Sequence, residues 1–445
     1  MKEGLSLNNL LINYYNNNNQ LNCNFHYPLQ EMLLMMTSNN KYSIQNRILM
    51  IELHDKSGTP FFKRNFEKND KTIEQILIKE HPSSIHMGKI YTNIINTHVL
   101  DLNPINKDFI HPPIFTKEEK DIVFDIDASD YDMGISLLHF FKAYGNLQVM
   151  NTDEKKLQIS DTLQSLRVCS CKSKKTACSL CWYLMGSASI VIKYFMVELF
   201  NINNFLWVYS GNRGVHCWIR DNQLISLDEN MRKCLIDIMM MNTDENIFNN
   251  LTNHYDLFDK LFSTELYPYF KKMIISNHIL KLLEPLIFLF ITNYYKLIEQ
   301  SLKDNWDEID QKISLLNDEN DIYRLNLEKW TNFENFSKNI KWTCNNNILP
   351  EPYKFIVFRL LYPIFDSKVT SQIDHLLKLP FSIHKTTKRL SFPIAFDEIP
   401  TLPIDNTDFI KRISIENHYR CKKGECGIDD IMTKSKYLIN DWLNK

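Results

Sequence analysis

The feature that most constrains this chain is an apolar strand pattern carrying two carboxylates, Ile122-Val123-Phe124-Asp125-Ile126-Asp127. In an extended strand, side chains two positions apart point to the same face, so Asp125 and Asp127 are predicted to project together. Adjacent carboxylates repel each other, and a hard cation such as Mg²⁺ relieves the repulsion by taking their oxygens as ligands. The pattern indicates a metal-dependent site, and a solvated strand end or turn is the alternative it leaves open.

The composition allows a large core around that strand. The chain has 445 residues, 44% of them hydrophobic, which suffices for two domains or one large domain with insertions. Its net charge is only −2, so any nucleic-acid contact has to come from local basic patches. The N-terminus has no basic region followed by an apolar core, which predicts no secretory signal and an intracellular protein. The longest uncharged run, 176–192, is short for a membrane span, so we expect a buried helix and no membrane partner.

Four of the ten cysteines fall close together, at Cys169, Cys171, Cys178 and Cys181. Four thiolates grouped in this way, the second pair at Cys-x-x-Cys spacing, are typical of a closed, structural zinc site. A redox pair is the alternative, but no thioredoxin-like unit surrounds these cysteines. The segment that follows, 182–197, is predicted to be a helix that covers a sheet.

A strand, a turn and a second strand are predicted over 205–219. The two strands are rich in aromatic and β-branched residues, and Ser210-Gly211-Asn212-Arg213-Gly214 is the turn between them. Two glycines leave backbone N–H groups free to form an anion-binding nest, and Arg213 and His216 add charge and hydrogen bonds at its mouth. Such a nest suits a triphosphate, whereas an ordinary hairpin turn with a structural histidine is the alternative.

Further strands and helices are predicted on either side of these motifs. Residues 48–53 and 61–64 form a hairpin around a Ser57-Gly58-Thr59-Pro60 turn, with Arg64 on its second strand, and 85–91 form another sheet element. Helical apolar spacing with almost no glycine fills 224–341. The chain ends in one or two helices.

Taken together, these motifs resemble those of the small, catalytic subunit of archaeal and eukaryotic DNA primases. The resemblance covers most of 48–393 apart from two inserted regions. It is carried by the acidic strand with Asp130-Tyr131-Asp132, the four cysteines with Trp182, the motif over 206–218, and His375-Leu376-Leu377-Lys378 with Pro380-Phe381-Ser382-Ile383-His384. The implied fold is α+β: a mixed-sheet primase catalytic core at 1–223 and 342–400, a zinc-binding knot at 167–183, a helical insertion at 224–341 and a C-terminal helical tail at 401–445.

The resemblance also implies the site residues. Asp125, Asp127 and Asp366 would hold two Mg²⁺ or Mn²⁺ ions, and the four cysteines would hold Zn²⁺. The implied nucleotide-binding residues are Ser210, Gly211, Asn212, Arg213, His216, Lys378, His384, His375, Leu376, Leu377 and Arg64. This chain departs from the family pattern at Asn212, where relatives usually have a second arginine. It departs again at His86, where many carry an acid near the ribose, and at Arg47-Ile48, where arginine and glutamate are common.

The implied function is DNA-templated synthesis of short RNA primers from ribonucleoside triphosphates by two-metal nucleotidyl transfer, for the initiation of DNA replication. The implied partners are the large primase subunit with its iron-sulfur cluster, a replicative DNA polymerase assembly and a single-stranded DNA template, in the nucleus. Two alternatives stay open. One is a repair-type primase-polymerase that uses deoxynucleotides, and the other is a catalytically silent, zinc-bearing nucleic-acid-binding subunit.

Overall fold

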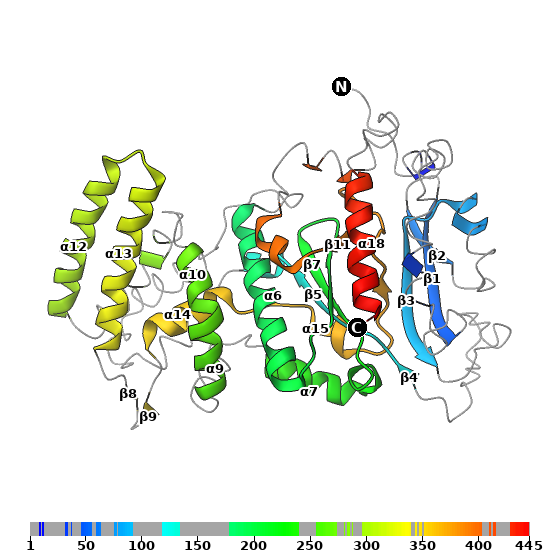
Figure 1. Cartoon of the computed structure of the whole chain (residues 1–445), viewed down its shortest axis with the longest axis horizontal. Coiled ribbons are helices and arrows are strands. Elements are labelled where there is room, and N and C mark those ends of the chain that lie inside the picture. Colours follow the sequence, from blue (N-terminus) through cyan, green and yellow to red (C-terminus); the bar gives the residue numbers. More distant parts are fainter. Residues whose placement is uncertain are drawn as a thin grey trace, which may run out of the picture.

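The computed structural model describes residues 46–55, 59–63, 79–91, 118–133, 178–239, 255–273, 296–339, 351–402 and 428–444, with shorter pieces between them. Figure 1 shows one antiparallel sheet at one end of the molecule, a second sheet in the middle and a group of helices at the other end. Arg64, Cys169 and Cys171 lie outside the described residues, and so does most of the region before residue 46. The predictions that involve them stay predictions.

The first sheet, sheet A, has the strand order β10-β3-β1-β2, with β4 paired to β3. Its strands are β1 (Arg47–His54), β2 (Pro60–Lys63), β3 (Ser84–Tyr91), β4 (Glu118–Glu119) and β10 (Leu377–Lys378). The hairpin predicted for 48–64 is confirmed for its described part, since β1 and β2 pair antiparallel from Ile51 opposite Lys63 to His54 opposite Pro60. The strand predicted over 85–91 is β3.

The second sheet, sheet B, has the order β11-β6-β7-β5 and carries the acidic strand at one edge. Its strands are β5 (Ile122–Asp127), β6 (Phe205–Tyr209), β7 (Gly214–Ile219) and β11 (Phe392–Ile394). The mixed sheet that we expected is wrong for the strand pairs that the structure describes, all of which are antiparallel. β5 and β6 do run in the same direction, but β7 turns back through a tight hairpin and pairs between them, so no parallel ladder forms.

Two long helices of the described part of the chain pack against sheet B. Helix α6 (Ser179–Phe200) is the predicted covering helix, and its Trp182 ring contacts the Tyr209 ring of β6. By length and composition α6 could cross a membrane, but 72% of its most apolar window is buried inside the protein, which confirms the predicted buried helix. The C-terminal helix α18 (Ile428–Asn444) packs on the other end of the sheet, where Asn204 donates a hydrogen bond to the Trp442 carbonyl oxygen.

The predicted helical region contains α7 (Glu229–Met239), α9 (Tyr255–Leu261), the π-helical turn η6 (Phe262–Leu266), α10 (Tyr267–Met273), α12 (Lys296–Ser314) and α13 (Glu319–Lys338). The short strands β8 (Thr343–Cys344) and β9 (Asn347–Ile348) and helix α14 (Pro352–Leu361) follow. Helix α13 begins at an N-cap, Asp318, whose carboxylate accepts hydrogen bonds from two backbone N–H groups of its first turn. Helix α7 packs against the short helix α15 (Ser367–Ser371) rather than against α12 and α13. The division of the chain at 224 and 341 stays a prediction.

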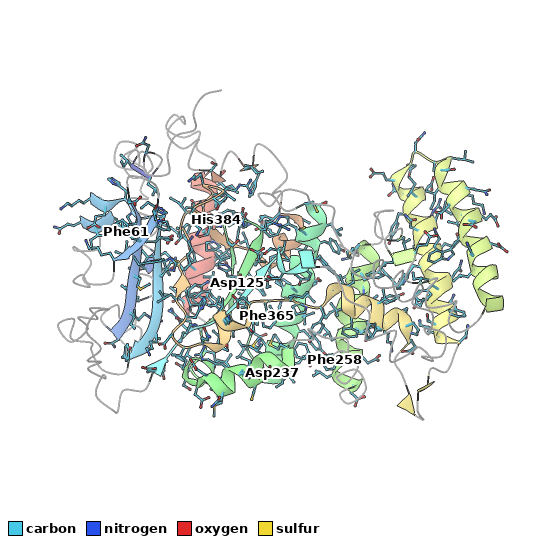
Figure 2. The ribbon with its side chains drawn as sticks, turned by 180° about the vertical axis from the view of Figure 1, so that it is seen from behind. Phe61, Asp125, Asp237, Phe258, Phe365 and His384 are labelled. Atoms are coloured by element: carbon cyan, nitrogen blue, oxygen red, sulfur yellow. The ribbon has the colours of Figure 1, made fainter. Side chains whose placement is uncertain are left out.

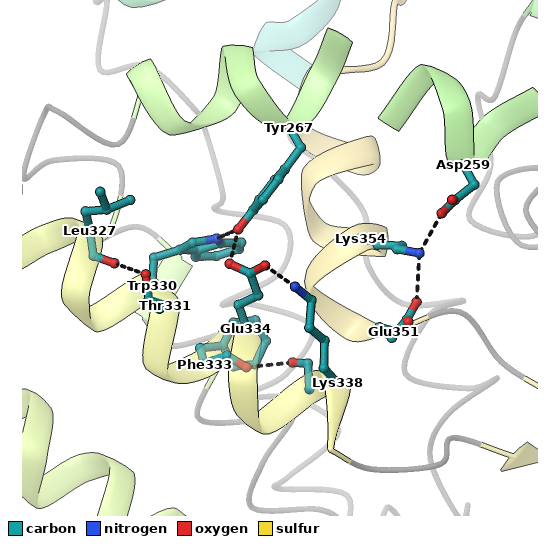
Figure 3. A network of polar contacts seen from close by, with 11 residues as sticks. Asp259, Tyr267, Leu327, Trp330, Thr331, Phe333, Glu334, Lys338, Glu351 and Lys354 are labelled. Atoms are coloured by element: carbon teal, nitrogen blue, oxygen red, sulfur yellow. Dashed lines mark hydrogen bonds and ion pairs between the residues drawn. The ribbon is translucent and has the colours of Figure 1, made fainter. Parts of the chain in front are cut away.

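Two groups of polar contacts lie inside the helical region (Figure 3), one joining α10 to α13 and the other joining α14 to α9. Tyr267 donates to the Glu334 carboxylate and accepts from the Trp330 indole N–H, and Lys338 binds the other Glu334 oxygen. Beside it, the Lys354 ammonium lies 2.6 Å from Asp259. Tyr267, Trp330, Glu334 and Lys354 are buried, and each of these contacts satisfies a polar atom that would otherwise lose its hydrogen bonds to water.

Candidate active site between the two sheets

The two carboxylates of β5 lie on one face of sheet B, as predicted. Asp125 and Asp127 are partly exposed, whereas Phe124 and Ile126, which alternate with them along the strand, are fully buried on the other face. His216 stands directly opposite Asp125 on β7, with its Nε2 3.3 Å from the Asp125 Oδ1. Burial alone would lower the pKa of His216, but Asp125 outweighs that effect and raises it above the ordinary value. The pair therefore favours an imidazolium beside a carboxylate.

Asp366 lies beside Asp125, although it is distant in the sequence. Its backbone N–H donates to the Asp125 carbonyl oxygen at 3.0 Å, and the neighbouring Phe365 ring packs edge-on against Phe124 at 5.3 Å between centroids. Figure 2 shows Asp125 and Phe365 together in the middle of the molecule, with His384 on the side toward sheet A. The structure thus brings together the three acids that the sequence singled out.

A fourth acid, Asp130, shows how strongly the carboxylates interact. It begins the short helical turn η4 (Asp130–Met133) that follows β5. Burial, together with the charges of Asp127, Asp125 and Asp366, raises the pKa of Asp130 to about 6. A cluster of oxygen donors with unrelieved negative charge is the donor set that hard divalent cations prefer.

Each of the three acids is engaged by a neighbour. Asp125 faces His216, the Asp127 Oδ1 accepts from the Ser129 N–H at 2.7 Å, and the Asp366 Oδ1 accepts from the Lys368 N–H at 2.9 Å. Among the residues that the structure describes, no three His, Cys, Asp or Glu side chains are grouped tightly enough to hold one ion as they stand. The donor types fit Mg²⁺ or Mn²⁺, and a carboxylate whose one oxygen accepts a hydrogen bond has a second oxygen that can coordinate a metal ion.

The turn between β6 and β7 differs in one respect from the predicted nest. The Ser210 hydroxyl accepts from the N–H groups of Asn212 and Gly214, at 3.3 and 3.1 Å. The expectation that the turn leaves its N–H groups free is therefore wrong for these two, because the serine side chain caps the turn from inside. Gly211 has a φ of +88°, which only glycine adopts readily, and its carbonyl oxygen accepts from the Thr387 hydroxyl at 2.6 Å.

Basic residues gather on the opposite side of that turn. Lys378 lies on β10, and His384 follows it closely in the chain. Burial, together with the nearby charges of Lys378, Lys385 and Arg389, lowers the pKa of His384 to about 4. Arg213 is buried within the turn itself. This region has the positive potential that a triphosphate requires.

Of the residues expected to line the sugar or base, the structure places His375 near the acids, Leu376 beside Gly88 and Leu377 in the core. His375 lies close enough for Asp366 and Asp125 to affect its pKa, and Leu376 contacts the backbone at Gly88. Leu377, however, pairs with Met87 and is only 2% exposed. Alternation along β10 turns the Leu377 side chain to the apolar face of sheet A while Lys378 faces the other way, and the role of Leu377 at the nucleotide stays a prediction.

Glu52 of β1 is a site-facing residue that sequence reasoning missed. Its carboxylate accepts from the Ser84 hydroxyl at 2.5 Å and lies 3.5 Å from the Nε2 of His86, which is paired with Lys378 in the sheet. Burial opposes ionisation of Glu52, but the hydrogen bonds from His86 and Ser84 prevail and lower its pKa to about 2. The sequence feature that could have identified Glu52 is its position as an acid inside an otherwise apolar strand.

Only half of the predicted zinc knot lies within the described residues. Cys178 is the N-cap residue of α6 and Cys181 lies in its first turn, with 3.7 Å between their sulfur atoms. Two thiolates on one tetrahedral zinc, each about 2.3 Å from the metal, lie about 3.8 Å apart. The described pair therefore has suitable spacing, and the four-cysteine site stays a prediction.

Replacing Gly211 tests the importance of the turn. A Cβ at this position would lie 3.0 Å from the His384 Cβ and 3.1 Å from the Arg389 carbonyl oxygen, in addition to the strain of the positive φ. We expect Gly211→Ala to lower the free energy of unfolding by about 1–3 kcal/mol and to weaken triphosphate binding. Denaturant unfolding and equilibrium binding of ATP measure the two effects. Asn203→Ala, in an exposed loop, is the control, and wild-type stability of Gly211→Ala would contradict this account.

Comparison with known proteins gives a consistent result. A family model described as the DNA primase small subunit matches residues 124–396, well over half of the chain. The DNA primase small subunit of Saccharomyces cerevisiae is 26% identical over 332 residues, which cover 71% of this chain and 66% of that protein. The counterparts in Schizosaccharomyces pombe and Drosophila melanogaster are 26% and 23% identical, with 60% and 65% of their own lengths covered. The chain thus spans slightly less than two thirds of these three relatives.

Proposed function

The chain belongs to the DNA primase small subunit family, and we propose that it is a catalytic primase subunit that makes short RNA primers on a DNA template. The observation that carries the proposal is the backbone hydrogen bond from Asp366 to Asp125, which sets the third acid beside the other two. Three carboxylates near a group of basic side chains are the parts that nucleotidyl transfer requires.

The side chains of the site divide into two groups in this proposal. Asp125, Asp127 and Asp366 would hold two Mg²⁺ or Mn²⁺ ions. When bound, such ions activate the attacking 3′-hydroxyl and neutralise charge on the triphosphate and the leaving pyrophosphate. The residues that would bind the triphosphate are Ser210, Arg213, His216, Lys378 and His384, with Arg64 approaching from the β1–β2 hairpin.

A bound anion would change the protonation of His384 and Lys378. Burial lowers the pKa of both groups, and neighbouring cations add to the effect on His384, whereas for Lys378 the Glu52 carboxylate partly opposes it, so each binds its proton less readily without a ligand. A bound triphosphate would offset the cationic repulsion and favour the protonated forms. The same groups would then donate charge-assisted hydrogen bonds to phosphate oxygens.

Primer synthesis by the full-length chain tests the proposal. With a single-stranded DNA template, a divalent cation and ribonucleoside triphosphates, we expect short RNA products. Preferred incorporation of deoxynucleotides would instead indicate a repair-type primase-polymerase. If neither pool is incorporated with Mg²⁺ or Mn²⁺, the catalytic assignment is wrong and a binding or scaffold role takes its place.

Partners follow from the same proposal. The relatives are named small subunits, which implies a larger partner subunit, and we propose an iron-sulfur large subunit within a nuclear replicative polymerase assembly. The near-neutral net charge of −2 agrees with template affinity supplied partly by that partner. Tight, salt-insensitive binding of template by this chain alone would contradict a shared role.

Zinc content tests the proposed knot. We expect about one zinc ion per chain, because four thiolates complete a tetrahedral site. Cys181→Ser should lose most of the zinc and lower the thermal unfolding midpoint, since Cys181 is buried at the start of the core helix α6. Metal analysis of the purified chain measures this, with Cys234→Ser as the control because Cys234 is exposed on α7. A zinc-free wild-type chain would rule the knot out.

A further inference from the structure

The position of Asp366 depends on the short helix α15 that it begins. Asp366 is the N-cap of α15, and the Thr370 hydroxyl on the same helix donates to the Val123 carbonyl oxygen at 2.7 Å. With the bond from the Asp366 N–H to Asp125, this ties one side of α15 to β5. The helix has five residues and is about 7.5 Å long, so its two ends move together.

The C-terminal end of α15 is held by a buried lysine. Lys120 is fully buried immediately before β5, and its ammonium donates to the carbonyl oxygens of Val369 and Gln372, at 2.8 and 2.7 Å. These carbonyls lie where a helix has no internal partners and where the negative end of its dipole falls. The lysine therefore closes the end of α15 opposite Asp366.

A buried arginine in turn holds the lysine. Arg232 of α7 is fully buried, and its Nη2 donates to the Lys120 carbonyl oxygen at 2.6 Å and to that of Ile225 at 3.1 Å. Its Nη1 lies 3.5 Å from the Thr370 carbonyl oxygen, and the Glu229 carboxylate accepts from the Ile373 N–H at 3.0 Å. The first turns of α7 thus support both Lys120 and the segment that follows α15.

If Lys120 served the fold alone, its burial would cost free energy that an apolar residue at the same position would not. Among the ion pairs of the described residues, none includes Lys120, and its nearest acid, Asp121, is occupied by Arg47 and Arg220. Burial, with Arg232 next, lowers the pKa of Lys120 to about 7, which reflects the cost of an ammonium in this environment. A methionine of similar length would fill the same space without that cost. What lysine adds is two N–H donors to α15.

We propose that Lys120, supported by Arg232, is a positioning residue that fixes α15 and thereby holds the Asp366 carboxylate in place for a divalent cation. The proposal rests on the proposed function, because it assumes that Asp366 is a metal ligand. It assigns no contact with nucleotide or metal to Lys120. Its effect reaches the site through the backbone of α15.

Two variants loosen α15 from different sides. Lys120→Met removes the donors at its C-terminal end, and Thr370→Val removes its bond to β5 while keeping the shape of the side chain. We expect both to weaken binding of Mn²⁺ alone, measured by calorimetry, by about 10- to 100-fold, as for groups that orient metal ligands. The Mn²⁺ concentration for half-maximal primer synthesis should rise equally, with kcat at saturating Mn²⁺ close to wild type.

Lys354→Met is the matched control. Lys354 is also a buried lysine, but it pairs with Asp259 and Glu351 in the helical region (Figure 3). The Lys354→Met variant should be less stable than wild type and keep wild-type Mn²⁺ affinity. If Lys120→Met and Thr370→Val bind Mn²⁺ as tightly as wild type, the positioning role is overturned and the proposed function stands. If Lys120→Met does not fold, the Mn²⁺ affinity of Thr370→Val alone tests the positioning role. A wild-type chain that neither binds Mn²⁺ nor makes primers overturns both proposals.

Discussion

Replacing Asp366 by asparagine should abolish primer synthesis while leaving the chain folded. The Asp366 Oδ1 caps α15 by accepting the Lys368 N–H, and an asparagine oxygen at the same place still accepts that bond. The backbone bond to Asp125 does not involve the side chain at all. What the substitution removes is one negative charge from a set of three, so the expected loss of activity exceeds about 100-fold, more than the loss of a group that merely orients a ligand.

The measurement needs activity, metal binding and stability on the same sample. Asp374→Asn is the control, because Asp374 follows α15 as Asp366 precedes it, but its side chain is 81% exposed and faces Lys89. The Asp366→Asn variant should fail to bind Mn²⁺ and keep the wild-type unfolding midpoint. Primer synthesis by this variant at even a tenth of the wild-type rate would remove Asp366 from the catalytic machinery.

Local pattern predicted the parts of this site that are close in sequence. The alternation that sets Asp125 and Asp127 on one face of a strand depends only on backbone geometry, and the Gly-rich turn before His216 predicts its hairpin. Asp366 has no such local signal. It lies beside Asp125 because a two-residue strand and a five-residue helix dock onto sheets formed by distant segments, and only the resemblance to a family pointed to it.

The groups that hold the site together were also hidden from sequence. Lys120 and Asp121 precede an apolar strand, and two charged residues at that place ordinarily indicate a solvated strand end. In the fold both are fully buried, because α7, α15 and sheet A close over them. The partners that make such burial tolerable, Arg47, Arg220 and Arg232, come from three separate segments. Pairing of this kind is a property of the tertiary structure.

Asp121 is expected to carry the largest effect on stability. It is fully buried between the sheets, where its Oδ2 lies 2.8 Å from the Nη1 of Arg47 on β1 and its Oδ1 lies 3.0 Å from the Nε of Arg220 after β7. Removing one member of a buried ion pair leaves the other charge without compensation, so Asp121→Asn should lower the free energy of unfolding by about 3–5 kcal/mol. Denaturant unfolding measures it. Asp237→Asn, at an exposed position on α7 (Figure 2), should change stability by less than about 0.5 kcal/mol.

The loss of unfolding free energy in Asp121→Asn should depend on pH, and that dependence identifies the cause of the loss. Burial alone would raise the pKa of Asp121, but Arg47 and Arg220 outweigh it and hold the pKa well below the ordinary value of 3.8. A carboxyl whose pKa is depressed by folding stabilises the native state above its unfolded pKa and loses that contribution as the pH falls toward the folded pKa. The stability difference between wild type and Asp121→Asn should therefore be constant above about pH 5 and shrink as the pH falls below about 4. A difference that does not change between pH 7 and the lowest pH at which the wild type stays folded would show that packing, and not the charge of Asp121, joins the two sheets.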